Sequence, residues 1–332
     1  MSLLTIEDLR IAFPSRSGPI EVVRGVNLEV QPGETVGLVG ESGSGKSLSC
    51  RSIIRLMAPR ARLSAQITFD GRDVMSMNKK ELREHRARNV GMIFQDPFSC
   101  FNPTKRIGEQ VAETLRVNAG MESSEARARA IELLANVEID RPEQRYRAYP
   151  HELSGGMRQR VMIAIAISAA PRLLIADEPT TALDVTTQAQ ILTLIEQRRR
   201  DLDMAVLLVS HDFGVIAQAC QRVAVMYGGY VVEAGPVDEI CARPRHPYTR
   251  ALLESIPSLE SAGRHVRREG IPGQPPTPGE MGSGCPFTNR CSYARPECAG
   301  VDMTLEIVGE NHTTACPFIR LADVSSTVGG GA

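Results

Sequence analysis

The sequence contains no tryptophan, and its aromatic residues make up only 4% of 332 positions. An aromatic platform on which single-stranded bases could stack is therefore not expected. An excess of one charge is missing as well, because 38 Lys and Arg residues oppose 39 Asp and Glu residues and leave a formal net charge of −1. This balance argues against a partner held by bulk electrostatics, such as duplex DNA. We expect no nucleic-acid partner.

Long apolar runs are also absent. The richest stretch, Val161 to Ala170, ends at Pro171, well short of the ~20 residues that a bilayer-spanning helix requires. Glu7 and Asp8 lie where a secretory signal would place its apolar core. We therefore expect a chain that stays in the cytoplasm, where disulfides are rare. With 42% hydrophobic residues, the chain still has enough apolar material for a packed core.

Short β-branched runs alternate with helical patterns, which indicates an α/β fold with a parallel sheet. We expect strands at 35–39, 173–176 and 205–209, and helices at 46–57, 161–170 and 186–199. The Arg- and Glu-rich stretch from about residue 79 to residue 152 is expected to be a helical insertion, with clear periodicity at 126–134. Proline and glycine dominate residues 270–284, which predicts an extended linker.

Residues 40–47 read GESGSGKS and fit the pattern G-x-x-x-x-G-K-[ST] between an expected strand and an expected helix. Such a loop turns its backbone N–H groups toward phosphate oxygens, next to the positive end of a helix dipole. The phosphate-binding residues are then Gly40, Glu41, Ser42, Gly43, Ser44, Gly45, Lys46 and Ser47. Lys46 should reach the β- and γ-phosphates, and the Ser47 hydroxyl should ligate Mg²⁺. The loop predicts a site for a nucleoside triphosphate.

Residues 172–179 read RLLIADEP and place two acids at the carboxyl end of an expected strand, where open α/β sheets bind ligands. Asp177 is a candidate to hold Mg²⁺, and Glu178 is a candidate to polarise the attacking water. Two acids after a strand can also be plain surface charge. Their combination with the phosphate loop favours a catalytic role.

A second anion site is expected at LSGGM, residues 153–157. Ser154 is a good helix cap, and Gly155 and Gly156 allow a phosphate or a backbone to approach closely. Ser-Gly-Gly before a helix also occurs without function. Two phosphate-binding elements in one small ATPase core suggest a site shared across a dimer.

GESGSGKS, LSGGM and RLLIADEP, in this order, resemble the nucleotide-binding domain of the ABC transporter family. Gln95 in IFQDP, Asp184 in the segment TALD and His211 in LLVSHD match further motifs of that family, and Phe13 lies where its members stack an aromatic ring on adenine. The resemblance implies that Gln95 and His211 contact the Mg²⁺ and γ-phosphate region. It also implies that two ATP molecules are sandwiched between two such domains, each by one phosphate loop and the Ser154, Gly155, Gly156 and Asp184 equivalents of the other domain.

FQDPFSCFNPT at 94–104, DEPTTALDVT at 177–186 and HPYTRALL at 246–253 are similar to the dipeptide/oligopeptide permease ATP-binding proteins. This resemblance implies an ATP hydrolase on the cytoplasmic face of the inner membrane, bound peripherally to two transmembrane permease subunits. It further implies a second, homologous ATPase chain and an extracytoplasmic substrate-binding protein. Relatives import nickel, glutathione or sugars as well as peptides, so the cargo stays open. A soluble ABC ATPase and a redox-sensing regulator are the alternatives from other classes.

The resemblance also implies a domain plan: a P-loop NTPase domain at 1–255 with an antiparallel β subdomain and a helical subdomain at about 96–160. A linker at 256–284, a four-cysteine module at 285–320 and a frayed tail at 321–332 follow.

Four of the eight cysteines cluster in that module, namely Cys285, Cys291, Cys298 and Cys316. Their spacing is compatible with a metal, with free thiols or with disulfides. The resemblance points to a four-iron four-sulfur cluster, with zinc as second choice. Cys50, Cys100, Cys220 and Cys241 are expected to be ordinary buried residues. His85, His151, His265 and His312 are expected to be solvated or locally hydrogen-bonded.

Overall fold

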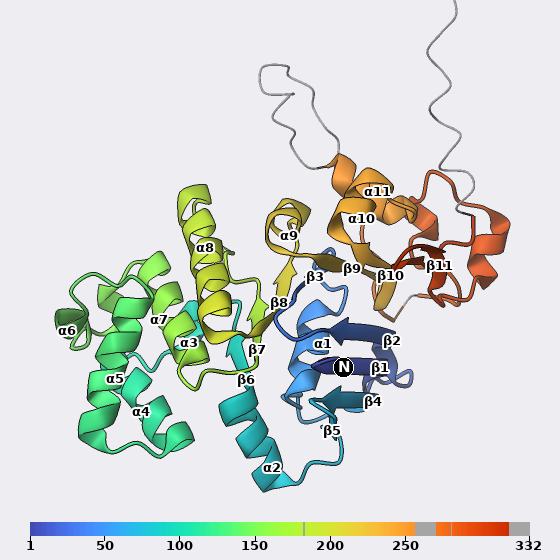
Figure 1. The fold of residues 1–332 in the computed structure, drawn as a ribbon. Coiled ribbons are helices and arrows are strands. Elements are labelled where there is room, and N and C mark those ends of the chain that lie inside the picture. The colour runs from blue at the N-terminus through green and yellow to red at the C-terminus, as the bar shows by residue number, and fades with distance from the viewer. Residues whose placement is uncertain (182, 256–269, 280, 319–332) are drawn as a thin grey trace, which may run out of the picture.

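The computed structural model describes residues 1–181, 183–255, 270–279 and 281–318. Its largest element is an eight-stranded sheet in the order β11-β12-β10-β9-β3-β8-β7-β6 (Figure 1). The five strands from β9 to β6 are parallel: β3 (Thr35–Val39), β6 (Val90–Ile93), β7 (Leu173–Asp177), β8 (Ala205–Ser210) and β9 (Arg222–Tyr227). The expected parallel sheet and its three expected strands are confirmed.

A second sheet is antiparallel and has the order β2-β1-β4-β5. Its strands are β1 (Leu4–Phe13), β2 (Ile20–Val30), β4 (Arg62–Phe69) and β5 (Arg72–Asp73). Apolar residues of this sheet form one core with α1 (Lys46–Ile53) and one face of the parallel strands. The opposite face of the parallel strands packs against the later helices in a second core. Strand β3 is buried along its whole length because it lies between the two cores.

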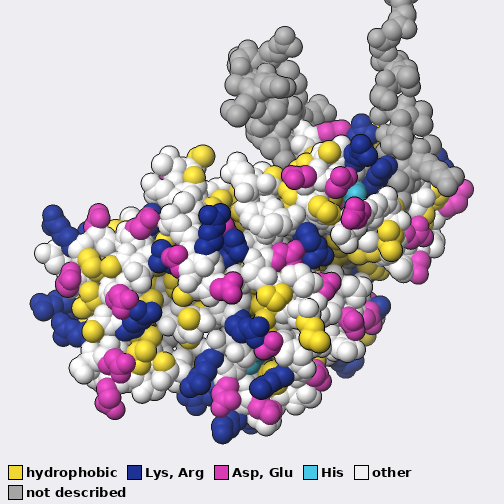
Figure 2. Space-filling view, viewed as in Figure 1, with side chains coloured by type: hydrophobic (Ala, Val, Ile, Leu, Met, Phe, Trp, Pro, Cys, Tyr) yellow, Lys and Arg dark blue, Asp and Glu magenta, His cyan; other side chains and the backbone are white. Residues whose placement is uncertain are grey.

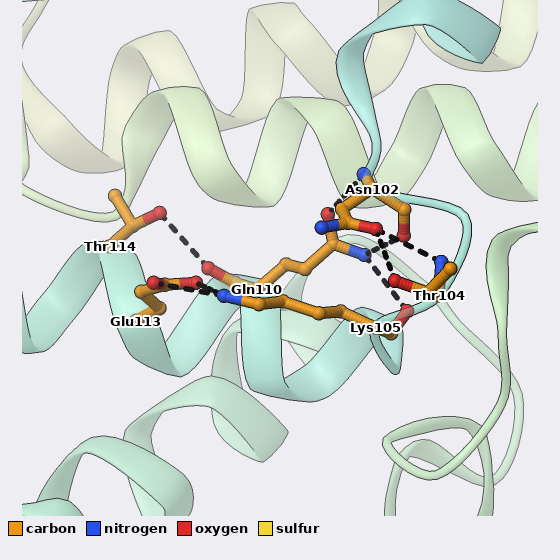
Figure 3. A network of polar contacts seen from close by, with 6 residues as sticks. All are labelled: Asn102, Thr104, Lys105, Gln110, Glu113 and Thr114. Carbon is orange, nitrogen blue, oxygen red and sulfur yellow. Dashed lines mark hydrogen bonds and ion pairs between the residues drawn. The ribbon is translucent and has the colours of Figure 1, made fainter.

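The helices from α3 to α8 lie together at the left of Figure 1. After α2 (Lys79–Glu84), the chain forms α3 (Pro97–Cys100), α4 (Ile107–Ala119), α5 (Ser123–Asn136), α6 (Pro142–Arg145) and α7 (Gly155–Ile167). The turn from α3 into α4 is held by Gln110, whose amide donates to the carbonyls of Asn102 and Lys105 (Figure 3). In the same network Lys105 pairs with Glu113 at 2.8 Å. Most of the expected insertion at 79–152 is helical, but the prediction is wrong for Val90–Ile93, which form β6 because they pair in parallel with β7 in the large sheet.

The remaining helices are α8 (Val185–Leu202), α9 (Phe213–Ala219), α10 (Val237–Ala242) and α11 (Pro247–Glu254). The expected helices at 46–57, 161–170 and 186–199 correspond to α1, α7 and α8, with ends that differ by at most six residues. None of the helices in the described part of the chain is long and apolar enough to cross a membrane. On the face in Figure 2, Lys and Arg side chains are interspersed with Asp and Glu.

The cysteine-bearing segment joins the large sheet. Strands β11 (Glu306–Gly309) and β12 (His312–Thr314) form an antiparallel hairpin, and β12 pairs with β10 (Tyr230–Pro236) in the register Glu233↔Thr314. Residues 270–279 and 281–284 contain no helix or strand, in keeping with the expected linker. Positions 256–269, 280 and 319–332 of the expected linker, module and tail lie outside the described residues.

Candidate functional site

The carboxyl ends of four neighbouring parallel strands lie at one edge of the large sheet. The phosphate loop follows β3, Gln95 follows β6, Glu178 follows β7 and His211 follows β8. Strand order β3-β8-β7-β6 thus collects segments that are far apart in the sequence at the edge where open α/β sheets bind ligands.

The phosphate loop needs glycine at two positions for different reasons. Gly40 has φ +157°, and a Cβ there would lie 2.1 Å from the carbonyl oxygen of Met226. Gly45 has φ +102° and is the residue before α1, with a Cβ contact of 3.0 Å to Val23. These conformations bring the loop onto the start of α1, where unpaired N–H groups favour an anion.

Lys46 is buried at the first position of α1 and folds back over the loop. Its Nζ donates to the carbonyls of Gly40 at 2.7 Å and Glu41 at 2.9 Å. Burial lowers the pKa of Lys46, and the carboxylates of Glu178 and Asp177 oppose that shift. The ammonium therefore lies between the loop and the acidic residues, where a phosphate would complete its hydrogen bonds.

Asp177 and Ser47 are joined across the site. The Ser47 hydroxyl donates to Asp177 Oδ1 at 2.8 Å, and the Asp177 side chain is fully buried. Within the described residues its second oxygen, Oδ2, has no hydrogen-bond partner. Burial raises the pKa of this carboxyl group. A buried carboxylate oxygen without a donor, next to a hydroxyl, is a donor set that suits Mg²⁺.

Glu178 is the meeting point of the candidate catalytic residues. Its Oε2 accepts from Gln95 Nε2 at 3.0 Å and from Thr181 Oγ1 at 2.9 Å, and it lies 3.3 Å from His211 Nδ1. Glu178 has φ +50°, a strained conformation for a residue with a Cβ, and such strain gathers at functional sites. The structure thus brings Glu178, Gln95 and His211 together. Sequence reasoning does not single out Thr181, the first residue of the segment TALD.

The expected second anion site is at the start of α7. Ser154 caps the helix by accepting from the Met157 N–H at 3.2 Å, and Gly155 and Gly156 are its first two residues. A Cβ on Gly156 would lie 2.9 Å from Cγ2 of Thr187. Thr187 in turn donates to Asp184, the cap of α8, through its N–H at 2.9 Å and its hydroxyl at 2.7 Å. The starts of α7 and α8 therefore form one surface.

This surface is not hydrogen-bonded to the phosphate loop. In the described chain, no hydrogen bond joins Ser154, Gly155 or Gly156 to residues 40–47. Beside Asp184, Val185 leaves 84% of its surface exposed. Phe13, at the end of β1, is partly buried against the core that β1 shares with α1. No contact tests its expected place next to adenine.

The four clustered cysteines line one cavity together with His246 and Phe287. Burial raises the pKa of the Cys285 thiol to about 11, and it also raises the pKa of Cys291 and Cys316. The Tyr293 N–H donates to Cys291 Sγ at 3.4 Å. In the described ranges, no group of three or more His, Cys, Asp or Glu side chains is arranged to hold a metal ion.

The other cysteines and the histidines differ in part from expectation. Cys50 is buried and Cys220 is half-buried, but Cys100 and Cys241 are exposed, so the prediction of four buried residues is wrong for the last two. His312 is buried and lies 2.7 Å from Glu233, 79 residues away in the sequence, so neither solvation nor a local bond describes it. His85 is buried as well, and its Nε2 lies 3.3 Å from the Ile53 carbonyl oxygen. His151 is exposed as expected, and His265 lies outside the described residues.

Comparison with known proteins finds ABC transporter families in two parts of the chain. A family model described as ABC transporter matches residues 23–181, and one described as the C-terminal region of oligopeptide/dipeptide transporters matches residues 232–298. The oligopeptide transport ATP-binding protein OppD of Bacillus subtilis (strain 168) is 48% identical over 294 residues, which cover 88% of this chain and 82% of OppD. OppD of Salmonella typhimurium is 42% identical over 314 residues, covering 95% of this chain and 93% of the relative.

Solved structures agree on the fold. The ATP-binding cassette MJ0796, in a dimeric post-hydrolysis state with ADP and Pi, is 28% identical and has a TM-score of 0.63. That similarity covers 70% of this chain and 98% of the cassette.

Proposed function

Because this chain belongs to the ATP-binding subunits of the ABC transporter family, in its oligopeptide/dipeptide branch, we propose that the edge of β3, β8, β7 and β6 forms one half of a composite ATP site. The chain is an ATP hydrolase that powers a peptide importer. The observation that carries the assignment of the site is the convergence of Gln95, Thr181 and His211 on one oxygen of Glu178.

In this proposal Glu178 is the general base. Its carboxylate would accept a proton from the attacking water, and Gln95 and His211, which both contact Glu178, would orient the water and the γ-phosphate. Lys46 binds the β- and γ-phosphates by exchanging its bonds to Gly40 and Glu41 for phosphate oxygens. The N–H groups of residues 40–47 supply the rest of the cradle.

Mg²⁺ would be held by Ser47, Asp177 and Gln95. The unpartnered Oδ2 of Asp177 supports this set, because a cation would satisfy a buried oxygen that now lacks a donor. When bound, the ion neutralises charge on the β- and γ-phosphates.

The other half of the site would come from a second chain. Ser154, Gly155, Gly156 and Asp184 lie on one surface that is not hydrogen-bonded to the described phosphate loop, and the exposed Val185 beside it suits a protein contact. We propose that the partner is a homologous but different ATPase chain. In this assembly two permease subunits and an extracytoplasmic binding protein complete the importer, and the ATPase lies on the cytoplasmic face of the inner membrane. Its cargo is peptides, by similarity to the OppD proteins. Phe13 would stack on adenine.

The proposed domain plan keeps the ATPase domain at 1–255, its helical subdomain at about 96–160, a linker at 256–284, a cysteine module at 285–320 and a tail at 321–332. In this plan the cysteine module also contributes strands β11 and β12 to the large sheet of the ATPase domain, because β12 pairs with β10.

For the cysteine module we propose a four-iron four-sulfur cluster held by Cys285, Cys291, Cys298 and Cys316. The four thiols line one cavity, and four cysteine thiolates are the ligand set that such a cluster takes. Burial raises the pKa of the Cys285 thiol, so a bound cluster would have to offset the cost of ionising it. Anaerobic purification with iron and sulfide assays tests this, and an iron-free protein loaded with zinc would contradict it.

Glu178→Gln tests the catalytic assignment. We expect ATP binding to persist while turnover by the assembled transporter falls at least ~10²-fold, the lower range for loss of a general base. Lys46→Ala should instead abolish measurable ATP binding in calorimetry. Glu125→Gln, an exposed change on α5, is the matched control and should leave both readouts unchanged. Near-normal turnover in the Glu178→Gln transporter would rule out Glu178 as the base.

A further inference from the structure

We propose that Arg290, from the cysteine module, is a positioning residue for the phosphate loop, and that it sets ATP affinity by fixing Glu41. The proposal rests on the nucleotide site proposed above. It adds a residue 249 positions away from the loop that sequence reasoning did not single out.

Arg290 is held on all sides. Its guanidinium forms a bidentate ion pair with the Glu41 carboxylate, at 2.6 Å from Nη1 to Oε2 and 3.0 Å from Nη2 to Oε1. It also donates to the Tyr227 hydroxyl at 3.0 Å and to the carbonyls of Pro272 at 2.8 Å and Ile271 at 3.0 Å. The side chain is only 6% exposed. A planar, fully bonded guanidinium of this kind loses little freedom when it fixes a carboxylate.

Glu41 is the second residue of the phosphate loop, and each of its polar groups has a partner. Its side chain pairs with Arg290, its N–H donates to the Tyr248 hydroxyl at 2.9 Å, and its carbonyl oxygen accepts from Lys46 Nζ at 2.9 Å. Tyr248 belongs to α11 and is fully buried. The loop is therefore fixed from outside by two residues of the C-terminal half, at the position where Lys46 is held.

The same arginine belongs to the turn that carries two of the cysteines. Thr288–Arg290 forms a 3₁₀ turn between Cys285 and Cys291, closed by the Thr288 N–H on Cys285 and the Cys291 N–H on Thr288. Arg290 therefore links the phosphate loop to the turn that positions Cys285 and Cys291.

This link bears on affinity because a phosphate loop binds best when its N–H groups are already aimed at the ligand. Releasing Glu41 frees the loop and Lys46 together, and ATP must then order both. The expected effect is weaker binding, with the fold left intact.

The test measures the Kd of ATP with Mg²⁺ by calorimetry on the full chain, with Arg290→Gln, Glu41→Gln and the double variant. Each single variant should raise the Kd about tenfold, the change that corresponds to 1.4 kcal/mol. The double variant should be no weaker than either single variant, because both remove the same pair. Arg290→Lys keeps the charge and loses the bidentate geometry, so its Kd should lie between those of the parent and Arg290→Gln. Hydrogen exchange of residues 40–45 should speed up in the single variants.

Arg295→Gln is the matched control, since Arg295 lies in the same module over the Phe318 ring and does not contact the loop. It should leave the Kd unchanged. Should Arg290→Gln fail to fold, Glu41→Gln decides, because it leaves Arg290 bonded to Tyr227, Ile271 and Pro272. Single variants that fold and bind ATP within twofold of the parent, or effects that add in the double variant, would overturn the proposal. If Lys46→Ala still bound ATP, the nucleotide site itself would be wrong, which is a separate outcome.

Discussion

Asp177 combines two opposing requirements in one side chain. Its full burial places an oxygen where a cation can use it, and the same burial opposes its charged form. Folding without a cation must therefore place a poorly solvated carboxylate next to Ser47. The residue favours binding at the expense of stability, as active-site groups commonly do.

Asp177→Asn should stabilise the protein in the absence of nucleotide and magnesium. A pKa raised above the unfolded value of about 3.8 gives a stability contribution that is present below that pH and is lost as the pH rises through the raised value. At pH 7 the neutral variant avoids this loss, and we expect its Tm to rise by on the order of 2 °C. The gain should vanish below pH 3.8, which a series of thermal melts would show.

Asp184→Asn should change the Tm at pH 7 in the opposite direction to Asp177→Asn. Hydrogen bonds from Thr187 lower the pKa of Asp184, so its contribution is present above pH 3.8 and is lost as the pH falls. The variant should melt lower than the parent at pH 7 and converge with it in acid. A drop in Tm for Asp177→Asn at pH 7 would contradict the account of Asp177.

At this scale the sequence predicts residues that belong to contiguous motifs, such as Lys46, Asp177 and Glu178. It identifies Gln95 and His211 by resemblance alone, since nothing near either residue encodes the distance to Glu178. Arg290 and Tyr248 were out of reach as partners of Glu41, because their contacts depend on a pairing across more than 200 residues. Thr181 could have been found, because it follows Glu178 by three residues in a turn.

Among the elements, the strands and helices with strong periodicity were predicted, and the short tail strands were not. β12 has three residues, too few for an alternating pattern, and its strand character comes from pairing with β10. The pairing buries His312 against Glu233, with their side chains 4% and 0% exposed. Glu233 also accepts the backbone N–H groups of Arg245 and His246. Tertiary contacts, more than local propensity, make this strand.

His312→Ala should therefore lower the free energy of unfolding by about 1–3 kcal/mol, the cost of leaving a buried polar group without its partner. Urea unfolding of the full chain measures it. His151→Ala, an exposed histidine, is the matched control and should change the value by less than about 0.5 kcal/mol. If the two variants behaved alike, the pair between β10 and β12 would not contribute to stability.

For the whole molecule, the proposal divides the ATP site between two chains. No hydrogen bond in the described residues joins the phosphate loop to the start of α7, in keeping with a site that a second chain would complete. The sequence indicates this division through two anion-binding motifs. It cannot show that the starts of α7 and α8 share one surface, because that depends on the packing of Gly156 against Thr187.

Val185→Asp tests the divided site at the scale of the assembly. Val185 is 84% exposed in the single chain, so the variant should keep the Tm and the ATP affinity of the parent. Burying an unpaired charge between two chains is costly, and we expect hydrolysis by the paired ATPases to fall at least ~10-fold. Val117→Asp is the matched control, because it makes the same substitution at a 57% exposed valine of α4. It should not affect hydrolysis by the two paired ATPase chains. Unchanged hydrolysis in Val185→Asp would place the contact between chains elsewhere.

The hairpin of β11 and β12 also has a consequence for solubility. It occupies the side of β10 that would otherwise present a row of free backbone groups, and the four-residue β11 becomes the short outermost strand. Open strand edges recruit other chains, whereas short outer strands do so poorly. A chain cut before the hairpin would keep every motif of the nucleotide site and would nevertheless be prone to aggregation during expression.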